Sequence, residues 1–200
     1  MTKHLIFVYG TLKTGYWNYD RILKDRAEFV GVATSVDRDY KMYGSSIPFL
    51  TRDSETDGDY VSGEVFEVNE VTLVLCDRLE GHPDHYCREE REFLVADRRV
   101  TAWVYLVPPG RIFADPRWLP DDGLLTWSMF KVGDQVANAY SSIVGTVTDP
   151  SPKPGFVGVT FPGHGERGFP LRIDQIVEVS LVKLDEDEDY AEDDDGEAEL

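Results

Sequence analysis

The sequence predicts an α+β fold that is followed by a small all-β barrel. In the first half, short segments rich in β-branched and aromatic residues alternate with two stretches of helical periodicity. From Ser128 onward, four or five short strand-like segments are separated by Gly/Pro turns, without helical periodicity. The 55 residues from 128 to 182 therefore predict a small SH3-like barrel.

Composition agrees with a chain that folds and buries a core. Hydrophobic residues make up 42% and aromatic residues 12% of the 200 residues. There is no run of 18 apolar residues, so no transmembrane helix is expected, and the apolar stretch at residues 5–9 is too short for a signal peptide. The two cysteines, Cys76 and Cys87, lack CxxC spacing. They are expected to be small core or helix-face residues of a cytoplasmic protein.

The net charge of −18 lies mostly at the C-terminus. Residues 185–200 contain eleven acidic and no basic residues, whereas the preceding 184 residues carry a net charge of −7. Such a tail has too little apolar surface to fold, so a disordered, solubilising tail is expected there. The alternative is a segment that binds basic partners through its negative charge. No basic stripe that could neutralise phosphates is visible, so nucleic-acid binding is not expected.

Strand and turn signals divide the first half into short elements. The apolar run at residues 4–9 ends at Gly10 and predicts a buried strand. Asn18 is expected to cap a short helix over residues 18–25. Further strands are expected at residues 28–36, at 41–52 in two short pieces, at 60–68, and at 86–96 and 99–107 as a pair with a polar turn at 97–99.

The clearest helix signal follows Asn69. This residue offers an N-cap, and Gly81 stands where a C-cap glycine is expected. Apolar residues between them recur at i, i+4 and i+8, which predicts one apolar face made of Val71, Leu75 and Leu79.

A glycine-containing loop of Tyr9, Gly10, Thr11 and Leu12 follows the first strand. Backbone N–H groups at a strand end can bind a carboxylate or an oxyanion, and glycine permits a close approach. On turn statistics alone, the same pattern is more often an ordinary tight turn.

Glu80 is the last residue of the predicted helix. The negative end of the helix dipole disfavours its ionised form, and burial would raise its pKa toward a value useful for proton transfer. An exposed helix-terminal glutamate is the alternative. Aromatic residues at strand positions, namely Tyr86, Trp103 and Tyr105, can line a pocket, although core packing is favoured for Trp103.

Other chemistries fit the sequence less well. His82, Asp84 and His85 lie within four residues, but proline interrupts them and no partner cluster is present, so no metal site is expected. There is no GxSxG motif for a serine hydrolase, and no base lies near Thr11 in the sequence to make it a nucleophile.

Several segments of the first half form a recognisable set: YGTLKTG, then Asn18, SGEVFEV, DRLEGHPDHYCRE and AWVYLV. This set resembles the gamma-glutamylcyclotransferase-like superfamily, and within it the gamma-glutamylamine cyclotransferases, over roughly residues 3–108. Related glutathione-specific and gamma-glutamyl-amino-acid enzymes carry serine in the loop, where this chain has Thr11. The resemblance implies a small mixed β-barrel flanked by helices.

The resemblance also implies an activity. Glu80 would be the acid/base residue while the substrate's own α-amino group attacks its γ-carbonyl, which releases 5-oxoproline and a free amine. No metal or organic cofactor is implied. The residues that would bind the substrate are Tyr9, Gly10, Thr11 and Leu12, through backbone amides, and Tyr86 and Tyr105 as pocket walls.

Four segments follow from these patterns. We expect a gamma-glutamylcyclotransferase-like domain at residues 1–118, a linker at 119–127, an SH3-like β-barrel at 128–184 and the acidic tail at 185–200. The second barrel exceeds the minimal enzyme of the superfamily. It can cover the pocket, dock a protein partner through residues 128–183, or mediate oligomerisation. A non-catalytic small-molecule-binding or docking protein is the alternative to an active enzyme, and the presence of both Glu80 and the YGTL loop favours the enzyme.

Overall fold

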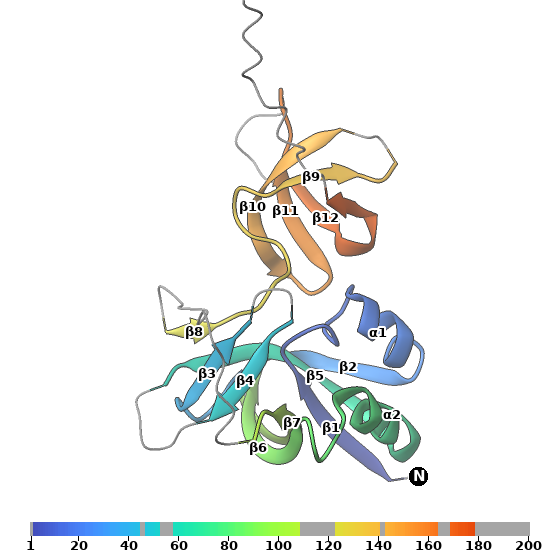
Figure 1. Ribbon diagram of the computed structural model, residues 1–200, viewed down its shortest axis with the longest axis vertical. Helices are drawn as coiled ribbons and strands as arrows, with labels where there is room; N and C mark the ends of the chain where they lie inside the picture. Colours follow the sequence, from blue (N-terminus) through green and yellow to red (C-terminus); the bar gives the residue numbers. More distant parts are fainter. Residues whose placement is uncertain are drawn as a thin grey trace, which may run out of the picture.

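The computed structural model of the protein describes residues 2–44, 47–52, 58–108, 123–140, 143–163 and 169–178. The described strands form a sheet in the first half, a second sheet near the C-terminus and a small hairpin (Figure 1). The predicted acidic tail and the first part of the predicted linker lie outside the described residues. No helix in the described ranges is long and apolar enough to cross a membrane.

The first sheet closes into a barrel. Its strands run in the order β1 (Lys3–Val8), β7 (Arg98–Leu106), β6 (Cys87–Val95), β2 (Ala27–Ser35) and β5 (Tyr60–Asn69), and β5 pairs back with β1. β1 and β7 run parallel, whereas the other neighbouring pairs are antiparallel. The mixed β-barrel predicted for the first half is confirmed.

Three short strands lie beside the barrel. β3 (Tyr40–Tyr43) and β4 (Phe49–Arg52) form the antiparallel hairpin predicted as two extended pieces. β8 (Leu124–Leu125) pairs in parallel with β5, and Leu125 and Trp127 are fully buried. These residues fall in the predicted linker, yet they belong to the first sheet because their apolar side chains join its core.

β1 is buried on both faces, which explains its continuous apolar run. Phe7 faces the barrel interior and stacks on Phe93, with ring centroids 3.9 Å apart. Ile6 and Val8 belong to a second apolar cluster outside the barrel. This division follows from the alternation of side chains along a strand.

Two helices lie on the outside of the barrel, beside β1 and β2 (Figure 1), and both contribute residues to the outer cluster. The first, α1 (Trp17–Ile22), begins after Tyr16, whose backbone has the extended conformation of an N-cap residue. The predicted Asn18 cap is therefore wrong, because Asn18 lies inside the helix. Its side chain instead donates a hydrogen bond to Thr11 Oγ1 at 2.8 Å.

The second helix, α2 (Glu70–Glu80), has the predicted caps but a partly different buried face. The Asn69 side chain accepts a hydrogen bond from the backbone N–H of Thr72, and Gly81 adopts the left-handed conformation with φ 63°. The predicted face is confirmed in part: Leu75 and Leu79 pack against the outer apolar cluster, whereas Val71 is 69% exposed. Because β5 runs into α2 without a loop, the strand fixes which side of the helix meets the barrel. The buried residues are Thr72, Leu73 and Cys76.

The β6–β7 hairpin is confirmed, with its turn one residue earlier than predicted. Val95 pairs with Arg98, which leaves Ala96 and Asp97 as the turn residues. Both have positive φ, as the common two-residue hairpin turn requires.

The C-terminal sheet is entirely antiparallel, and its longest strand continues through two prolines where the sequence predicts a turn. Its order is β12 (Phe169–Arg172), β11 (Phe156–Thr160), β10 (Val144–Lys153), β9 (Gln135–Asn138) and β13 (Ile176–Glu178), with the 3₁₀ turn η1 (Ile173–Gln175) before β13. The all-β character of this region is confirmed, whereas its closure as an SH3-like barrel stays a prediction.

The C-terminal sheet packs on the loop that follows β1. Buried residues of both sheets belong to one apolar cluster. The hydroxyls of Tyr16 and Ser128 lie 3.1 Å apart. A Cβ added to Gly15 would lie only 2.9 Å from Gly155 Cα, so the two backbones are in close contact. This contact matters for the site because the loop also carries candidate substrate-binding residues.

Candidate active site

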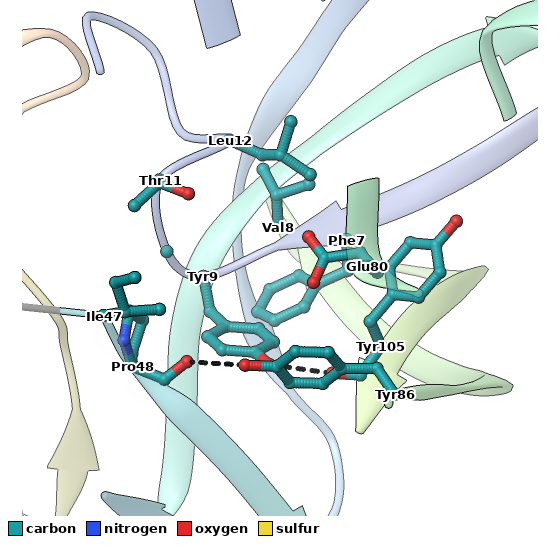
Figure 2. A pocket seen from close by; sticks show the side chains of 11 residues that line it. Phe7, Val8, Tyr9, Thr11, Leu12, Ile47, Pro48, Glu80, Tyr86 and Tyr105 are labelled. Carbon is teal, nitrogen blue, oxygen red and sulfur yellow. Dashed lines mark hydrogen bonds between the residues drawn. The ribbon is translucent and has the colours of Figure 1, made fainter. Parts of the chain in front are cut away.

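A pocket of about 370 Å³, including space open to solvent, lies at the end of β1 (Figure 2). The structure brings all seven predicted site residues to it: Tyr9, Gly10, Thr11, Leu12, Glu80, Tyr86 and Tyr105. Phe7, Val8, Ile47 and Pro48 complete its described lining. The residues that the structure describes in this lining all come from the first half, so the C-terminal sheet does not contribute to it.

The loop 9–12 is held in one shape by its neighbours. The backbone N–H of Lys13 donates to Gly10 O at 2.9 Å, which closes a turn. Asn18 of α1 holds the Thr11 hydroxyl. Gly10 lies against Pro48, since a Cβ at this position would come within 2.7 Å of the proline ring. Glycine is therefore required at this position by close packing.

The backbone amides of this loop are available to a ligand. In the described part of the chain, no hydrogen bond uses the backbone N–H of Gly10, Thr11 or Leu12 as its donor. Backbone donors without a protein partner need water or a ligand. Three such groups in sequence can bind a carboxylate or an oxyanion.

Glu80 reaches the pocket because it lies on the buried face of α2. It follows Leu73 and Cys76 at i, i+3 and i+7, and these positions share one side of a helix. The left-handed Gly81 then ends the helix. Figure 2 shows the Glu80 carboxyl directed into the space beside Val8 and Leu12.

Burial raises the pKa of Glu80 from 4.5 to about 7. The residue keeps part of its surface exposed, so a ligand can reach the carboxyl, but its contact with water is much reduced. No hydrogen bond or ion pair to this carboxyl occurs within the described ranges, so nothing offsets the lost hydration. A carboxyl with this pKa can accept and donate a proton near neutral pH.

Tyr9 and Tyr86 form one side of the pocket with their rings. The Tyr9 hydroxyl donates to Tyr105 O at 2.8 Å, and burial raises its pKa. The Tyr86 ring stacks on Phe49, with centroids 6.2 Å apart. The Tyr86 hydroxyl is directed to Pro48 O at 3.5 Å, which is a weak contact (Figure 2). Both rings are therefore fixed in place.

Tyr105 presents its ring to the pocket and directs its hydroxyl away from Glu80 (Figure 2). That hydroxyl donates to Asp77 Oδ1 at 2.7 Å, and Arg88 holds both oxygens of Asp77 at 2.8 and 2.7 Å. Burial and this hydrogen bond raise the pKa of Tyr105. Trp103 is not among the described lining residues; its ring lies under the Arg88 guanidinium, 4.6 Å from it.

Sequence reasoning missed five residues in or beside the pocket. Phe7 and Val8 belong to the strand that precedes the loop 9–12. Ile47 and Pro48 come from the connection before β4, far along the chain from the loop 9–12, and only the barrel brings them there. Asn18 was taken as a helix cap, and no signal in the sequence revealed its bond to Thr11.

His82 and Cys76 have structural surroundings in this fold. His82 Nδ1 accepts a hydrogen bond from the backbone N–H of Arg88. Among the residues that the structure describes, no three His, Cys, Asp or Glu side chains are grouped to hold a metal ion. Burial raises the pKa of Cys76 to about 12, which keeps its thiol protonated.

The first part of the chain is similar to a known protein family and to several of its members. Residues 6–123 match the family model described as "Gamma-glutamyl cyclotransferase, AIG2-like". The "Putative gamma-glutamylcyclotransferase" of Methanocaldococcus jannaschii is 36% identical over 104 residues, which cover 52% of this chain and 83% of that protein. Gamma-glutamylaminecyclotransferase B of Danio rerio is 38% identical over 90 residues, covering 42% of this chain and 46% of that protein. A crystal structure of an AIG2-like protein from Mus musculus is 30% identical, with a TM-score of 0.47, over 54% of this chain and 78% of that chain.

The match to the family model takes in the second half of β1, the strands β2 to β7, both helices and all described residues that line the pocket. It covers more than half of the chain and ends before the C-terminal sheet. The chain therefore belongs to the gamma-glutamyl cyclotransferase, AIG2-like family.

Proposed function

We propose that this protein is an active cyclotransferase of the gamma-glutamylamine type, which releases 5-oxoproline and a free amine from a gamma-glutamyl amide. The observation that carries this proposal is a carboxyl with a pKa of about 7, Glu80, in the same pocket as the loop 9–12. Proton transfer requires such a pKa, whereas binding alone does not. The similarity to gamma-glutamylaminecyclotransferases of Danio rerio supports the amine type.

The proposed reaction is an intramolecular aminolysis. The α-amino nitrogen of the substrate bonds to its γ-carbonyl carbon, and the bond from that carbon to the departing amine nitrogen breaks. Because the nucleophile is tethered to its target, the pocket needs only to hold the substrate in a near-attack geometry. A serine or cysteine nucleophile is not needed.

Glu80 moves the proton in this reaction. Its ionised form takes a proton from the attacking nitrogen, and the acid so formed returns that proton to the departing nitrogen. General acid–base catalysis of this kind contributes about 100- to 10,000-fold to the rate. The raised pKa of Glu80 makes both steps accessible near neutral pH.

The loop 9–12 stabilises charge on the substrate. The unused N–H groups of Gly10, Thr11 and Leu12 can hold the substrate carboxylate or the oxyanion of the tetrahedral intermediate. One oxyanion donor contributes about 2.7–4 kcal/mol to transition-state stabilisation. The rings of Tyr86 and Tyr105 form the apolar walls.

The direct test is 5-oxoproline release from gamma-glutamyl-lysine isopeptide, gamma-glutamyl-alanine and glutathione. We expect turnover of the isopeptide by the wild type and a loss of about 100-fold or more in Glu80→Gln. The matched control is Glu90→Gln, which changes an exposed carboxylate of β6 and should keep full activity.

Two outcomes separate the alternatives. If the folded wild type turns over none of the three compounds, the result favours a binding protein on the same scaffold or a substrate outside this panel. If it turns over glutathione alone, the enzyme is not of the amine type.

The C-terminal half of the chain carries separate predictions, which do not concern the cyclotransferase reaction. We infer an SH3-like barrel at residues 128–184 after a first domain at 1–118, with a protein partner docking through residues 128–183. The described lining of the pocket contains no residue of the C-terminal sheet. This supports a role of the C-terminal half away from the pocket mouth.

A further inference from the structure

A second cavity lies between the barrel and the C-terminal sheet. It encloses about 740 Å³, including space open to solvent. Its polar lining comes from both parts of the chain: Lys13, Ser62, Glu64, Thr126, Ser151 and Lys153. The described linings of the two cavities share no residue, although Lys13 directly follows Leu12 of the pocket. Consecutive residues of one loop therefore line two separate cavities.

Two oppositely charged side chains in this cavity are almost fully buried. Lys13 is 5% exposed and Glu64 is 4% exposed. Lysine and glutamate are rarely buried to this extent unless they are paired. The proposed cyclotransferase reaction uses neither of them.

Each charge has only part of its hydrogen-bonding capacity satisfied. Lys13 Nζ, which has three donors, donates to Trp127 O at 2.6 Å. Oε2 of Glu64 accepts from the backbone N–H and the hydroxyl of Thr14, at 2.9 and 2.7 Å. Oε1 of Glu64 has no hydrogen-bond partner within the described ranges. Lys13 Nζ also lies 5.9 Å from the ring centroids of Tyr16 and Trp127. Two donors of Lys13 and one oxygen of Glu64 are therefore without a hydrogen-bond partner among the described residues.

The two charges are held apart. Within the residues that the structure describes, no ion pair of 4.0 Å or less joins Lys13 to Glu64. Their fixed bonds to Trp127 and Thr14 keep each in place. Burial lowers the pKa of Lys13 to about 8 and raises that of Glu64, although the two charges attract each other and Thr14 donates to Glu64. The protein therefore replaces only part of the hydration that both groups have lost.

We propose that this cavity binds a small zwitterion of the α-amino acid class, with its carboxylate on Lys13 and its ammonium on Glu64. A ligand with one charge would satisfy one of these residues and be repelled by the other. The exposed Lys153 adds a second positive charge to the lining, and the hydroxyls of Ser62, Thr126 and Ser151 add further hydrogen-bonding groups. The site does not depend on cyclotransferase activity.

Calorimetric titration of the full chain tests the charge requirement. The probes are glycine, L-alanine and L-lysine, with acetate and methylamine as ligands of a single charge. We expect the amino acids to bind at least about 10-fold more tightly than either single-charge probe, because truncating one side of a buried charge pair costs this much or more. Acetate that binds as tightly as L-alanine would overturn the zwitterion assignment, as would the absence of binding by all three amino acids.

Variants locate the binding. Lys13→Met and Glu64→Gln should each weaken L-alanine binding by at least about 10-fold. Both residues are buried, so their substitution can also disturb the fold, and Val32→Trp is the second test. Val32 lines the cavity and is 50% exposed. A bulky side chain at this position should block the cavity without changing the core. Glu80→Gln should bind L-alanine as the wild type does. Undiminished binding in Val32→Trp, or loss of binding in Glu80→Gln, would contradict the proposal.

Discussion

Replacing Glu80 by glutamine is expected to stabilise the fold at high pH while it removes the proposed chemistry. The pKa of this carboxyl is raised by burial from 4.5 to about 7, so the folded protein holds the proton more tightly than the unfolded chain does. The stability that this proton contributes is fully present below pH 4.5 and is lost as the pH rises through about 7. Glutamine keeps the size of the protonated acid but cannot ionise.

The magnitude follows from the size of the pKa shift. A shift from 4.5 to about 7 is worth about 3 kcal/mol of unfolding free energy once the carboxyl is ionised in both states. At pH 5, the ordinary glutamate of the unfolded chain is already partly ionised, so about 1 kcal/mol of this penalty is present. The stability advantage of Glu80→Gln over the wild type should therefore grow by about 2 kcal/mol between pH 5 and pH 8.

Urea unfolding of the wild type and Glu80→Gln, followed by fluorescence at several pH values, measures this difference. All other titrating groups are common to both proteins and cancel in the comparison. Glu90→Gln, at an exposed position of β6, serves as the control and should differ from the wild type by an amount that does not change with pH. A difference for Glu80→Gln that is equally flat from pH 5 to pH 8 would refute a raised pKa and with it the proposed acid/base role.

Three further predictions concern the pocket and the loop that carries it. The kcat/KM for 5-oxoproline release should rise with pH and level off with an apparent pKa of about 7, because Glu80 accepts a proton only when ionised. Asn18→Ala removes the 2.8 Å bond that holds the loop hydroxyl, and steady-state kinetics should show a KM about 5-fold higher, corresponding to about 1 kcal/mol. Left-handed backbone strain at a non-glycine residue costs about 1–3 kcal/mol. Gly15→Ala should lower the free energy of unfolding by more than this, because the added Cβ would also lie 2.9 Å from Gly155 Cα. Gly133→Ala, at φ 96° with nothing within 4 Å, should show the strain alone in the same denaturant titration.

Each of these predictions has a contrary outcome. A rate that does not vary from pH 5.5 to pH 8 would remove Glu80 from the rate-determining proton transfer. An unchanged KM in Asn18→Ala would mean that the loop keeps its shape without this bond. Equal destabilisation by the two glycine substitutions would show that the backbone at Gly155 can move away from an added Cβ at residue 15 at little cost in free energy.

Local patterns in the sequence determined most elements of this fold. Period-two alternation located β2, β5, β6 and β7, and turn residues separated the short strands of the C-terminal sheet. The Asn69 and Gly81 caps of α2 could be predicted because capping depends on residues adjacent in the chain. The candidate pocket residues came from a family resemblance, and the structure places all seven around one pocket.

Only the tertiary structure decided which faces are buried and which distant residues meet. The apolar spacing of α2 favoured Val71, yet the direct join to β5 turns the side with Cys76 inward, and this rotation carries Glu80 into the pocket. The second cavity could not be predicted either, because its lining combines Lys13 and Glu64 with residues of the C-terminal half that are far away in the chain. Periodicity and caps act over a few residues, whereas burial, and with it the pKa of a carboxyl or an ammonium group, is set by contacts between segments far apart in the chain.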